Sequence, residues 1–124
     1  MSESANYEIR TDIAFGGLER IDLPGLVEAC EHVWFNQSLC KVNDSVVRLG
    51  IFEGEFHFHK HDEEDEVFLV LEGSLLMDFE DRTVELNQHQ AILVPRGVVH
   101  RPRSPERSVV LMIEGDTVDP RGDA

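Results

Sequence analysis

Short segments in which apolar and polar residues alternate, separated by turn residues, most constrain how this chain can fold. The alternation begins near Ser38, and turn pairs such as Asn43-Asp44, Glu72-Gly73 and Asn87-Gln88 interrupt it. A period of two is typical of strands, and many short strands with tight turns indicate a sandwich or barrel. We therefore predict an all-β domain. The expected strands are residues 38–42, 45–52, 55–61, 67–71, 74–80, 83–86, 91–94, 99–101 and 108–114.

The two segments that flank this β region do not show its alternation of apolar and polar residues. Residues 1–37 are mixed, and within them Pro24 opens a stretch that places Leu26, Ala29 and Val33 on one helical face. We expect residues 1–37 to form a strand and helix arm that packs on a barrel of residues 38–114. The polar segment 115–124 is expected to be a loosely held tail.

Charge limits the partners of this chain. Its 124 residues contain 11 Lys+Arg against 25 Asp+Glu, a net charge of -14, while 41% hydrophobic residues suffice for one core. An acidic surface repels nucleic acid and anionic membranes, so neither is an expected partner.

The compartment is expected to be the cytoplasm. No basic stretch followed by an apolar one opens the sequence, and no apolar run approaches the ~18 residues of a membrane helix. The spacing of the two cysteines, Cys30 and Cys40, matches neither a CxxC pair nor a zinc-finger pattern. Two free thiols fit a reducing compartment, and a single disulfide between them is the alternative.

Three histidines alternate along one expected strand. His57, His59 and His61 lie in the segment 55–61, so a period of two places them on one face, about 6.6 Å apart. Neighbouring imidazoles at a strand end can converge on one metal ion. The alternative is a partly exposed polar face without any ligand role.

An acidic run follows these histidines, and its last member differs from the others. Residues 62–66 are all acidic, which normally indicates a solvated loop, but Glu66 opens the next strand and shares parity with Phe68 and Val70. A carboxylate that points into a core needs a partner. A metal ion held by His59 and His61 would be that partner. Histidines with one carboxylate suit Fe, Mn, Co, Ni, Cu or Zn.

The spacing of these residues resembles a known family. Residues 59–61, followed by Glu66 and Gly73, resemble the first motif of the cupins, and residues 95–97, followed by His100, resemble the second. The amino-acid sequence around Glu66 and His100 is especially similar to that of small single-domain cupins of the type called mannose-6-phosphate-isomerase-like.

The resemblance implies a fold and a metal site. The fold would be a double-stranded β-helix, or jelly roll, with a short N-terminal helical segment. By position, His59, His61, Glu66 and His100 match the four ligands of the family. They would hold one divalent transition metal ion per chain, with Fe, Mn, Zn, Ni, Co and Cu all open, and water or substrate would complete the coordination.

The sequence departs from the cupin motifs at turns. Glu53 stands where the first motif usually has Gly, and Gly54 follows one position later. His89 and Gln90 stand where the second motif usually has Gly and Asp, and Ser104 replaces a late Asn. These differences concern the geometry of turns and not the ligand positions.

His57 and an apolar wall extend the candidate site. His57 is either a catalytic general acid/base above a bound substrate or an inert histidine in a far layer of the barrel. Strand parity directs five apolar residues inward, where they would line a substrate pocket, although core packing explains them equally well. These residues are Phe68, Val70, Leu75, Met77 and Phe79.

Together these features predict a metal-binding cupin that is a metal-dependent enzyme acting on a small organic molecule, with isomerase or dioxygenase chemistry. The alternatives are a binding module without turnover and a structural metal site. Val67, Leu69 and Leu71 face away from the interior yet are apolar. The surroundings of the second sheet, the N-terminal segment or a second subunit must cover them, and we expect a homodimer.

Overall fold

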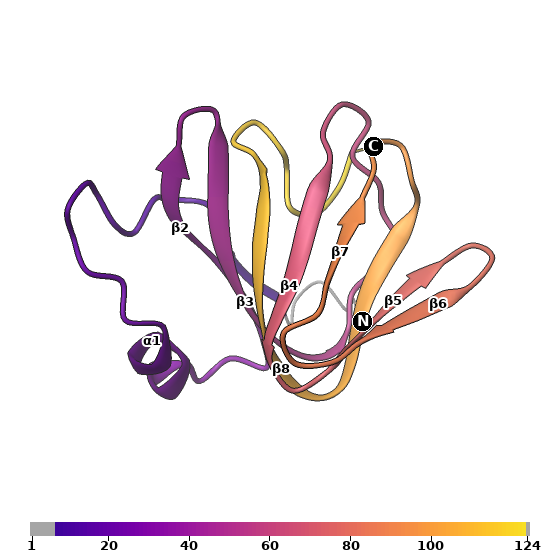
Figure 1. The fold of residues 1–124 in the computed structure, drawn as a ribbon, viewed down its shortest axis with the longest axis horizontal. Coiled ribbons are helices and arrows are strands. Elements are labelled where there is room, and N and C mark those ends of the chain that lie inside the picture. Colours follow the sequence, from indigo (N-terminus) through magenta and orange to yellow (C-terminus); the bar gives the residue numbers. More distant parts are fainter. Residues whose placement is uncertain (1–6, 124) are drawn as a thin grey trace.

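The computed structural model describes residues 7–123 of the chain (Figure 1). Among these residues it contains a single helix, α1 (Leu23–Ala29). None of the described helical segments has the length and apolar character needed to cross a membrane. The strands are β1 (Tyr7–Arg10), β2 (Trp34–Val42), β3 (Ser45–Glu55), β4 (Glu66–Glu72), β5 (Leu75–Phe79), β6 (Thr83–Leu86), β7 (Ala91–Val94) and β8 (His100–Gly115).

One long strand joins the two halves of the barrel. The strands follow the order β1-β2-β3-β8-β4-β7, and β5 pairs with both β6 and β8. The C-terminal half of β8 lies between β3 and β4, whereas its first residues, His100 to Arg103, pair with β5. β8 therefore belongs to both sheets, and the predicted double-stranded β-helix with a short N-terminal helix is confirmed.

The core fills the interior between the two sheets. Its members are apolar side chains at alternating positions of strands from both halves, because alternation directs every second residue inward. The buried members are Trp34, Phe52, Phe56, Phe68, Val70, Leu75, Met77, Leu86, Val94, Val110 and Met112.

The segment that carries the three alternating histidines is not the regular strand that we predicted. β3 ends at Glu55, and its ladder with β8 already shifts register between Phe52 and Gly54. Gly54 has a φ of 109°, a conformation that glycine adopts without strain, so the chain turns away from the path of β3 there. Phe56 consequently points into the core, although simple alternation would place it on the opposite face.

The last two predicted strands, 99–101 and 108–114, are parts of β8. We expected Pro105 and Glu106 to separate them, but the strand continues through this point. Pro102 pairs with Met77 of β5, and its carbonyl accepts a hydrogen bond from the Phe56 amide at 3.1 Å. The backbone therefore stays extended through both prolines.

The N-terminal arm is shorter and more ordered than the sequence suggested. β2 begins at Trp34, inside the segment expected to be the arm, and β1 pairs with it in parallel. α1 ends at Ala29 because Cys30 is extended, with φ -75° and ψ 125°.

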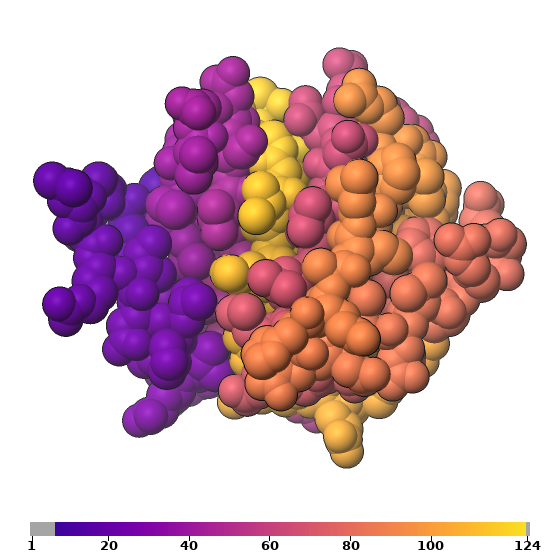
Figure 2. Space-filling model, viewed as in Figure 1, coloured from indigo at the N-terminus to yellow at the C-terminus, as the bar shows by residue number. Residues whose placement is uncertain are grey.

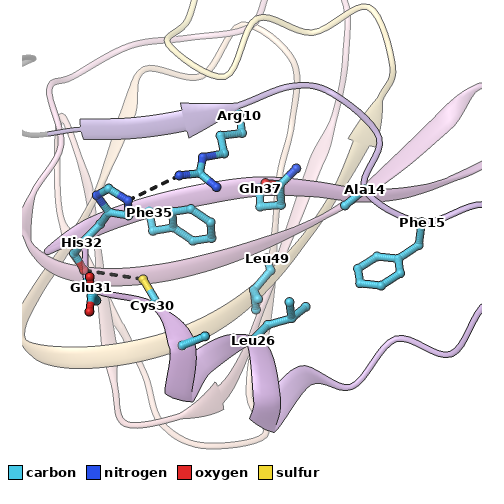
Figure 3. Close-up of a pocket in the computed structure, with 11 residues that line it drawn as sticks. Arg10, Ala14, Phe15, Leu26, Cys30, Glu31, His32, Phe35, Gln37 and Leu49 are labelled. Atoms are coloured by element: carbon cyan, nitrogen blue, oxygen red, sulfur yellow. Dashed lines mark hydrogen bonds between the residues drawn. The ribbon is translucent and has the colours of Figure 1, made fainter.

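The arm covers part of an apolar outer surface of the larger sheet. Phe15, Leu26 and Val27 of the arm pack against a cluster that includes Leu49 and Val109. A cavity of about 380 Å³ remains between the arm and the sheet, with Arg10 and His32 at its rim (Figure 3).

The rest of this outer surface is left open by the described residues. In-register neighbours on β7, β4 and β8 form an apolar row of Leu93, Val67 and Ile113, and Val47 of β3 extends it. Leu93 and Ile113 are 55% and 45% exposed. Figure 2 shows β3, β8, β4 and β7 side by side on this face, with the arm confined to one flank.

The C-terminal segment beyond β8 lies against the barrel mouth instead of extending away as a loosely held tail. The Asp123 amide donates to the Lys60 carbonyl at 2.8 Å, and Asp123 Oδ2 accepts a hydrogen bond from the Asp62 amide at 2.7 Å. These backbone partners lie in the histidine segment, so the chain end is folded back over that segment.

Candidate metal centre

Main-chain hydrogen bonds fasten the histidine segment to the start of β8. The amides and carbonyls of His59 and His100 are joined reciprocally at 2.9 Å, and the Gly97 amide donates to the His61 carbonyl at 2.7 Å. Because these bonds fix the backbone on both sides, the side chains of His59, His61 and His100 are directed into one region of the interior.

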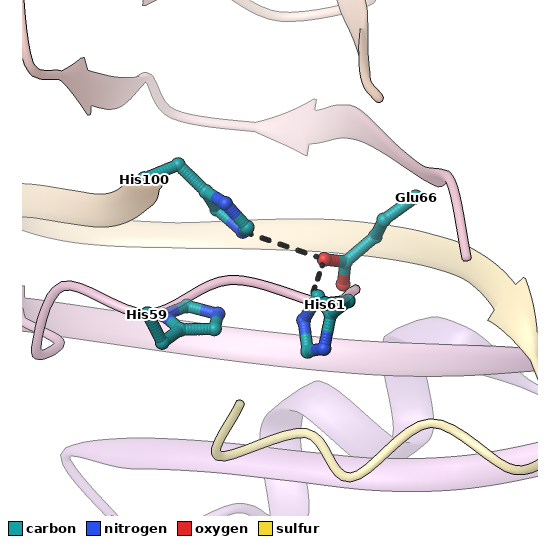
Figure 4. Close-up of side chains that lie close together, drawn as sticks. All are labelled: His59, His61, Glu66 and His100. Carbon is teal, nitrogen blue, oxygen red and sulfur yellow. Dashed lines mark ion pairs between the residues drawn. The ribbon is translucent and has the colours of Figure 1, made fainter. Parts of the chain in front are cut away.

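Glu66 enters the same region from the neighbouring strand. It opens β4 and is paired in register with Val94 of β7 and Glu114 of β8, which places it in the middle of the sheet. One ligand atom from each of His59, His61, Glu66 and His100 lies within 4.8 Å of the others. Figure 4 shows the four side chains converging from the histidine segment, β4 and β8.

Buried polar atoms without hydrogen-bond partners mark this cluster as compatible with a metal ion. Both ring nitrogens of His61, Nε2 of His100 and Oε1 of Glu66 are buried and lack a hydrogen-bond partner. The Glu66 oxygen lies 3.4 Å from His61 Nε2 and 3.6 Å from His100 Nε2, too far for good hydrogen bonds. Polar groups left in this state are costly, and a coordinated cation would satisfy the Glu66 oxygen, His100 Nε2 and one ring nitrogen of His61.

Two of the imidazoles are held in the tautomer that a metal requires. His59 Nδ1 lies 3.0 Å from the His57 carbonyl oxygen, and His100 Nδ1 lies 2.9 Å from the Val98 carbonyl oxygen. A carbonyl oxygen only accepts, so each Nδ1 carries the proton and donates it. Nε2 of each ring is therefore left with a free lone pair.

The electrostatics keep the cluster in its ligand form. Burial first, and the adjacent His100 ring second, lower the pKa of His59 from 6.5 to about 3. Burial alone would raise the pKa of Glu66, but its polar contacts with His100 and His61 outweigh burial and lower it from 4.5 to about 2. At neutral pH the site thus offers a neutral imidazole and a carboxylate.

The buried pair Glu114 and Arg48 influences where the negative charge near Glu66 resides. Burial, and then the Glu66 carboxylate, raise the pKa of Glu114 from 4.5 to about 9. Glu114 Oε1 lies 3.3 Å from Arg48 Nε, and these side chains are 1% and 3% exposed. Since Glu114 holds its proton at neutral pH, the negative charge of the carboxylate pair resides on Glu66.

The space next to the ligands is small. A cavity of about 20 Å³ is lined by His59, Glu66, Phe68, Asn36 and Pro120, among others. This volume suits about one water molecule. Organic ligands occupy sites of roughly 300–1,000 Å³, so such a ligand does not fit in this cavity in the present conformation.

The structure does not bring His57 into the cluster. Its Nε2 donates a hydrogen bond to the Arg121 carbonyl at 2.7 Å, and its ring lies 5.5 Å from that of His59, centre to centre. His57 stacks on Phe56 at the rim, because the turn at Gly54 rotates this part of the segment away from the interior. A catalytic role for His57 stays a prediction.

The predicted pocket residues occupy different places. Phe68 lines the small cavity. Val70, Leu75 and Met77 are buried in the interior core, and Phe79 is partly buried against that core. A substrate-lining role for the other four residues stays a prediction.

Sequence reasoning missed the residues that close the site. Pro120 lines the cavity, and Gly122 packs so closely on His59 that a Cβ at Gly122 would overlap the Cβ of His59. Trp34 and Asn36 of β2 line the same cavity. The polar composition of the tail carried no signal for this position, whereas the parity of β2 would have directed Trp34 and Asn36 inward if the strand had been extended to Trp34.

A double-stranded β-helix with three histidines and one glutamate at the mouth defines a metal-binding class of barrel, and the comparisons agree. A family model described as the Cupin domain matches residues 46–114. The chain therefore belongs to the cupin family.

Two curated relatives show how far the likeness extends. The uncharacterized protein YdbB of Bacillus subtilis (strain 168) is 49% identical over 80 residues, which cover 64% of this chain and 71% of that protein. A mannose-1-phosphate guanylyltransferase of Sinorhizobium fredii is 30% identical over 73 residues, which cover 58% of this chain but only 14% of that protein.

Solved structures show the same barrel. A cupin-2 domain protein from Shewanella frigidimarina NCIMB 400 has a TM-score of 0.73 and 32% identity, and covers 77% of this chain and 93% of that chain. The protein NMB1881 of Neisseria meningitidis has a TM-score of 0.70 and 26% identity, and covers 78% and 99%.

Proposed function

We propose that this protein is a metal-dependent cupin enzyme that acts on a small organic molecule. The observation that carries the proposal is the convergence of His59, His61, Glu66 and His100. The last three carry buried nitrogen or oxygen atoms that have no hydrogen-bond partner. Such a donor set fits one divalent Fe, Mn, Zn, Ni, Co or Cu ion per chain. When bound, the ion supplies Lewis acidity or a site for oxygen chemistry, as isomerases and dioxygenases require.

The residues of this chain would prepare the site in three ways. The His57 and Val98 carbonyls fix the tautomers of His59 and His100, and protonated Glu114 leaves the charge on Glu66. The apolar residues around the cavity exclude bulk water. His57 is the candidate proton donor, because its ring lies 5.5 Å from that of His59, centre to centre.

A binding module without turnover is the second candidate. The observation that favours it is that His57 Nε2 already donates to a backbone carbonyl, so no second titratable group is poised over the cluster. In that case the ion would hold a ligand without transforming it.

We further propose a cytoplasmic homodimer. The free thiols of Cys30 and Cys40 support a reducing compartment. The open apolar row that contains Val67, Leu93 and Ile113 supports a second copy, because contiguous apolar surface on a sheet favours burial against a partner.

Elemental analysis tests the metal assignment. Protein purified without added metal is expected to carry about one transition metal ion per chain, and His59→Ala is expected to carry almost none. Iron would favour oxygen chemistry, and zinc would favour Lewis-acid chemistry. A wild-type protein that takes up no transition metal even after incubation with each of the six ions would overturn the proposal.

A further inference from the structure

We propose that residues 116–123, here called the C-terminal strap, are a gate over the small cavity beside His59 and Glu66, and that an organic ligand enters this cavity only when the strap lifts. The inference concerns access to the cavity, and it rests on the proposed function only in naming an organic ligand as what enters. It follows from where the strap lies and from how little space it leaves.

The strap forms one wall of the cavity. Pro120 is buried and lines the cavity together with His59 and Glu66. Gly122 lies directly against the His59 side chain, and its φ of 98° allows the chain to turn there. No side chain other than hydrogen fits at this position, so the approach to His59 depends on glycine.

Contacts hold the strap at its base, at Val118 and near Asp123. The Val118 carbonyl accepts a hydrogen bond from the buried Arg48 side chain at 3.3 Å, so this part belongs to the anchored base. At its base, Asp116 pairs with Lys41 at 2.7 Å, and the Asp116 amide donates to the Asp44 carbonyl at 2.9 Å. At its free end, Asp123 bonds the main chain of Lys60 and Asp62, and the Arg121 carbonyl accepts a hydrogen bond from His57. The end contacts can break while the base stays anchored.

On the side that faces the acidic run, a cavity lies beside the strap, although Val118 itself is buried. A cavity of about 230 Å³ separates Thr117, Val118 and Asp123 from Glu63 and Glu64, and it extends to the metal-ligand candidate His61. Asp123 of the strap lines this cavity together with Glu63 and Glu64, so carboxylates of like charge surround it. Space and repulsion both favour an opening motion on this side.

The cavity beside His59 and Pro120 has a volume of only about 20 Å³, so an organic ligand that binds there needs the strap to move. Displacement of Pro120 and Gly122 removes one wall without disturbing a ladder hydrogen bond of the barrel, because both residues follow the end of β8. The barrel can thus stay folded while the strap opens.

The single tryptophan of the chain provides a direct readout. Trp34 is 3% exposed and lines the cavity that Pro120 closes. Quenching of its fluorescence by acrylamide, in protein stripped of metal with EDTA, therefore measures how easily a small neutral molecule reaches the cavity. The test needs neither metal nor substrate, so its failure is separate from a failure of the proposed function.

Gly122→Ala is the informative variant, and Gly54→Ala is its matched control. Both positions have positive φ values, 98° and 109°, but an added Cβ at Gly54 meets nothing within 4 Å. We expect Gly122→Ala to raise the Stern–Volmer constant by about three-fold or more, and Gly54→Ala to leave it unchanged. Equal quenching of wild type and folded Gly122→Ala would overturn the proposal.

Asp123→Ala keeps the test decisive if Gly122→Ala does not fold. It removes the carboxylate that accepts the Asp62 amide and changes no residue that lines the small cavity. Quenching is again expected to increase, whereas Asp81→Ala, at an exposed position on the β5–β6 turn, is expected to match the wild type. Unchanged quenching in Asp123→Ala would likewise overturn the gate.

Discussion

The main chains of His59 and His100 bind each other through two reciprocal hydrogen bonds of 2.9 Å, although 41 positions separate them in the sequence. The pair forms an isolated bridge outside the regular ladders. Because this bridge joins the two cupin motifs directly at two of their histidines, the ligand geometry is set by the backbone before any ion binds. The predictions below begin with that site.

Glu66→Gln is expected to lower affinity for zinc by at least about 100-fold, since it removes the one carboxylate of the cluster while keeping its volume. Isothermal titration calorimetry of metal-free protein measures the effect. Glu63→Gln makes the same chemical change at an exposed position of the acidic run and should stay close to the wild type. If both variants bind zinc as the wild type does, Glu66 is not a ligand.

Asp78 links stability to acid pH. Hydrogen bonds from Arg103 first, then from Thr83 and Arg101, outweigh burial and lower its pKa well below the ordinary value of 3.8. The unfolded chain therefore binds this proton at higher pH than the folded one. The stabilisation is fully present above about pH 4 and is lost as the pH falls below that value.

Asp78→Asn tests this linkage by urea denaturation. At pH 7 the variant should lose on the order of 1–2 kcal/mol of unfolding free energy, a modest figure because both arginines are partly exposed. Its stability should fall less steeply than that of the wild type between pH 4 and pH 2. Asp81→Asn, whose side chain is 78% exposed, is the control and should show neither effect.

His89→Gly is expected to stabilise the protein by about 0.5–1 kcal/mol. His89 has a φ of 71°, a left-handed conformation that disfavours side chains, at the position where the cupin motif usually has glycine. Thermal denaturation should show a higher Tm for the variant. Asn87→Gly in the same turn lacks a positive φ and should lower the Tm, so a lower Tm for both variants would contradict this explanation.

Ile113→Asp is expected to convert the proposed homodimer into a monomer. Ile113 lies between Val67 and Val47 in the open apolar row, and a carboxylate there would be buried without a partner in the dimer. Light scattering after size-exclusion chromatography measures the mass. Val33→Asp, at a 62% exposed position outside that row, should leave the mass unchanged. A monomeric wild type would refute the interface.

The fold and the ligand set could be predicted because they depend on local patterns. Alternation directs Glu66 inward, and turn residues mark strand ends, so both signals are present within a few neighbouring positions. His89 shows the same for turns, because the motif already indicated a position suited to glycine. His100 could be assigned only through the spacing of the second motif.

The rest depends on long-range contacts that local patterns do not encode. Alternation predicted that His57 would face the ligands, but Gly54 bends the chain and Phe56 takes the inward place. The position of Pro120 over the cavity depends on a main-chain hydrogen bond from the Asp123 amide to the Lys60 carbonyl. A main-chain hydrogen bond of this kind can form between residues of almost any type, so the sequence does not indicate it. Pro105 and Glu106 likewise hid the continuity of β8.

The course of β8 through both sheets has a consequence for how the protein is made. β3, β4 and β5 each need β8 as a neighbour, and β8 is the last of the strands in chain order. On the ribosome, those earlier strands remain with unpaired edges until residues up to Gly115 have emerged. The barrel therefore closes late and in one step, and the nascent chain depends on protection from aggregation until then.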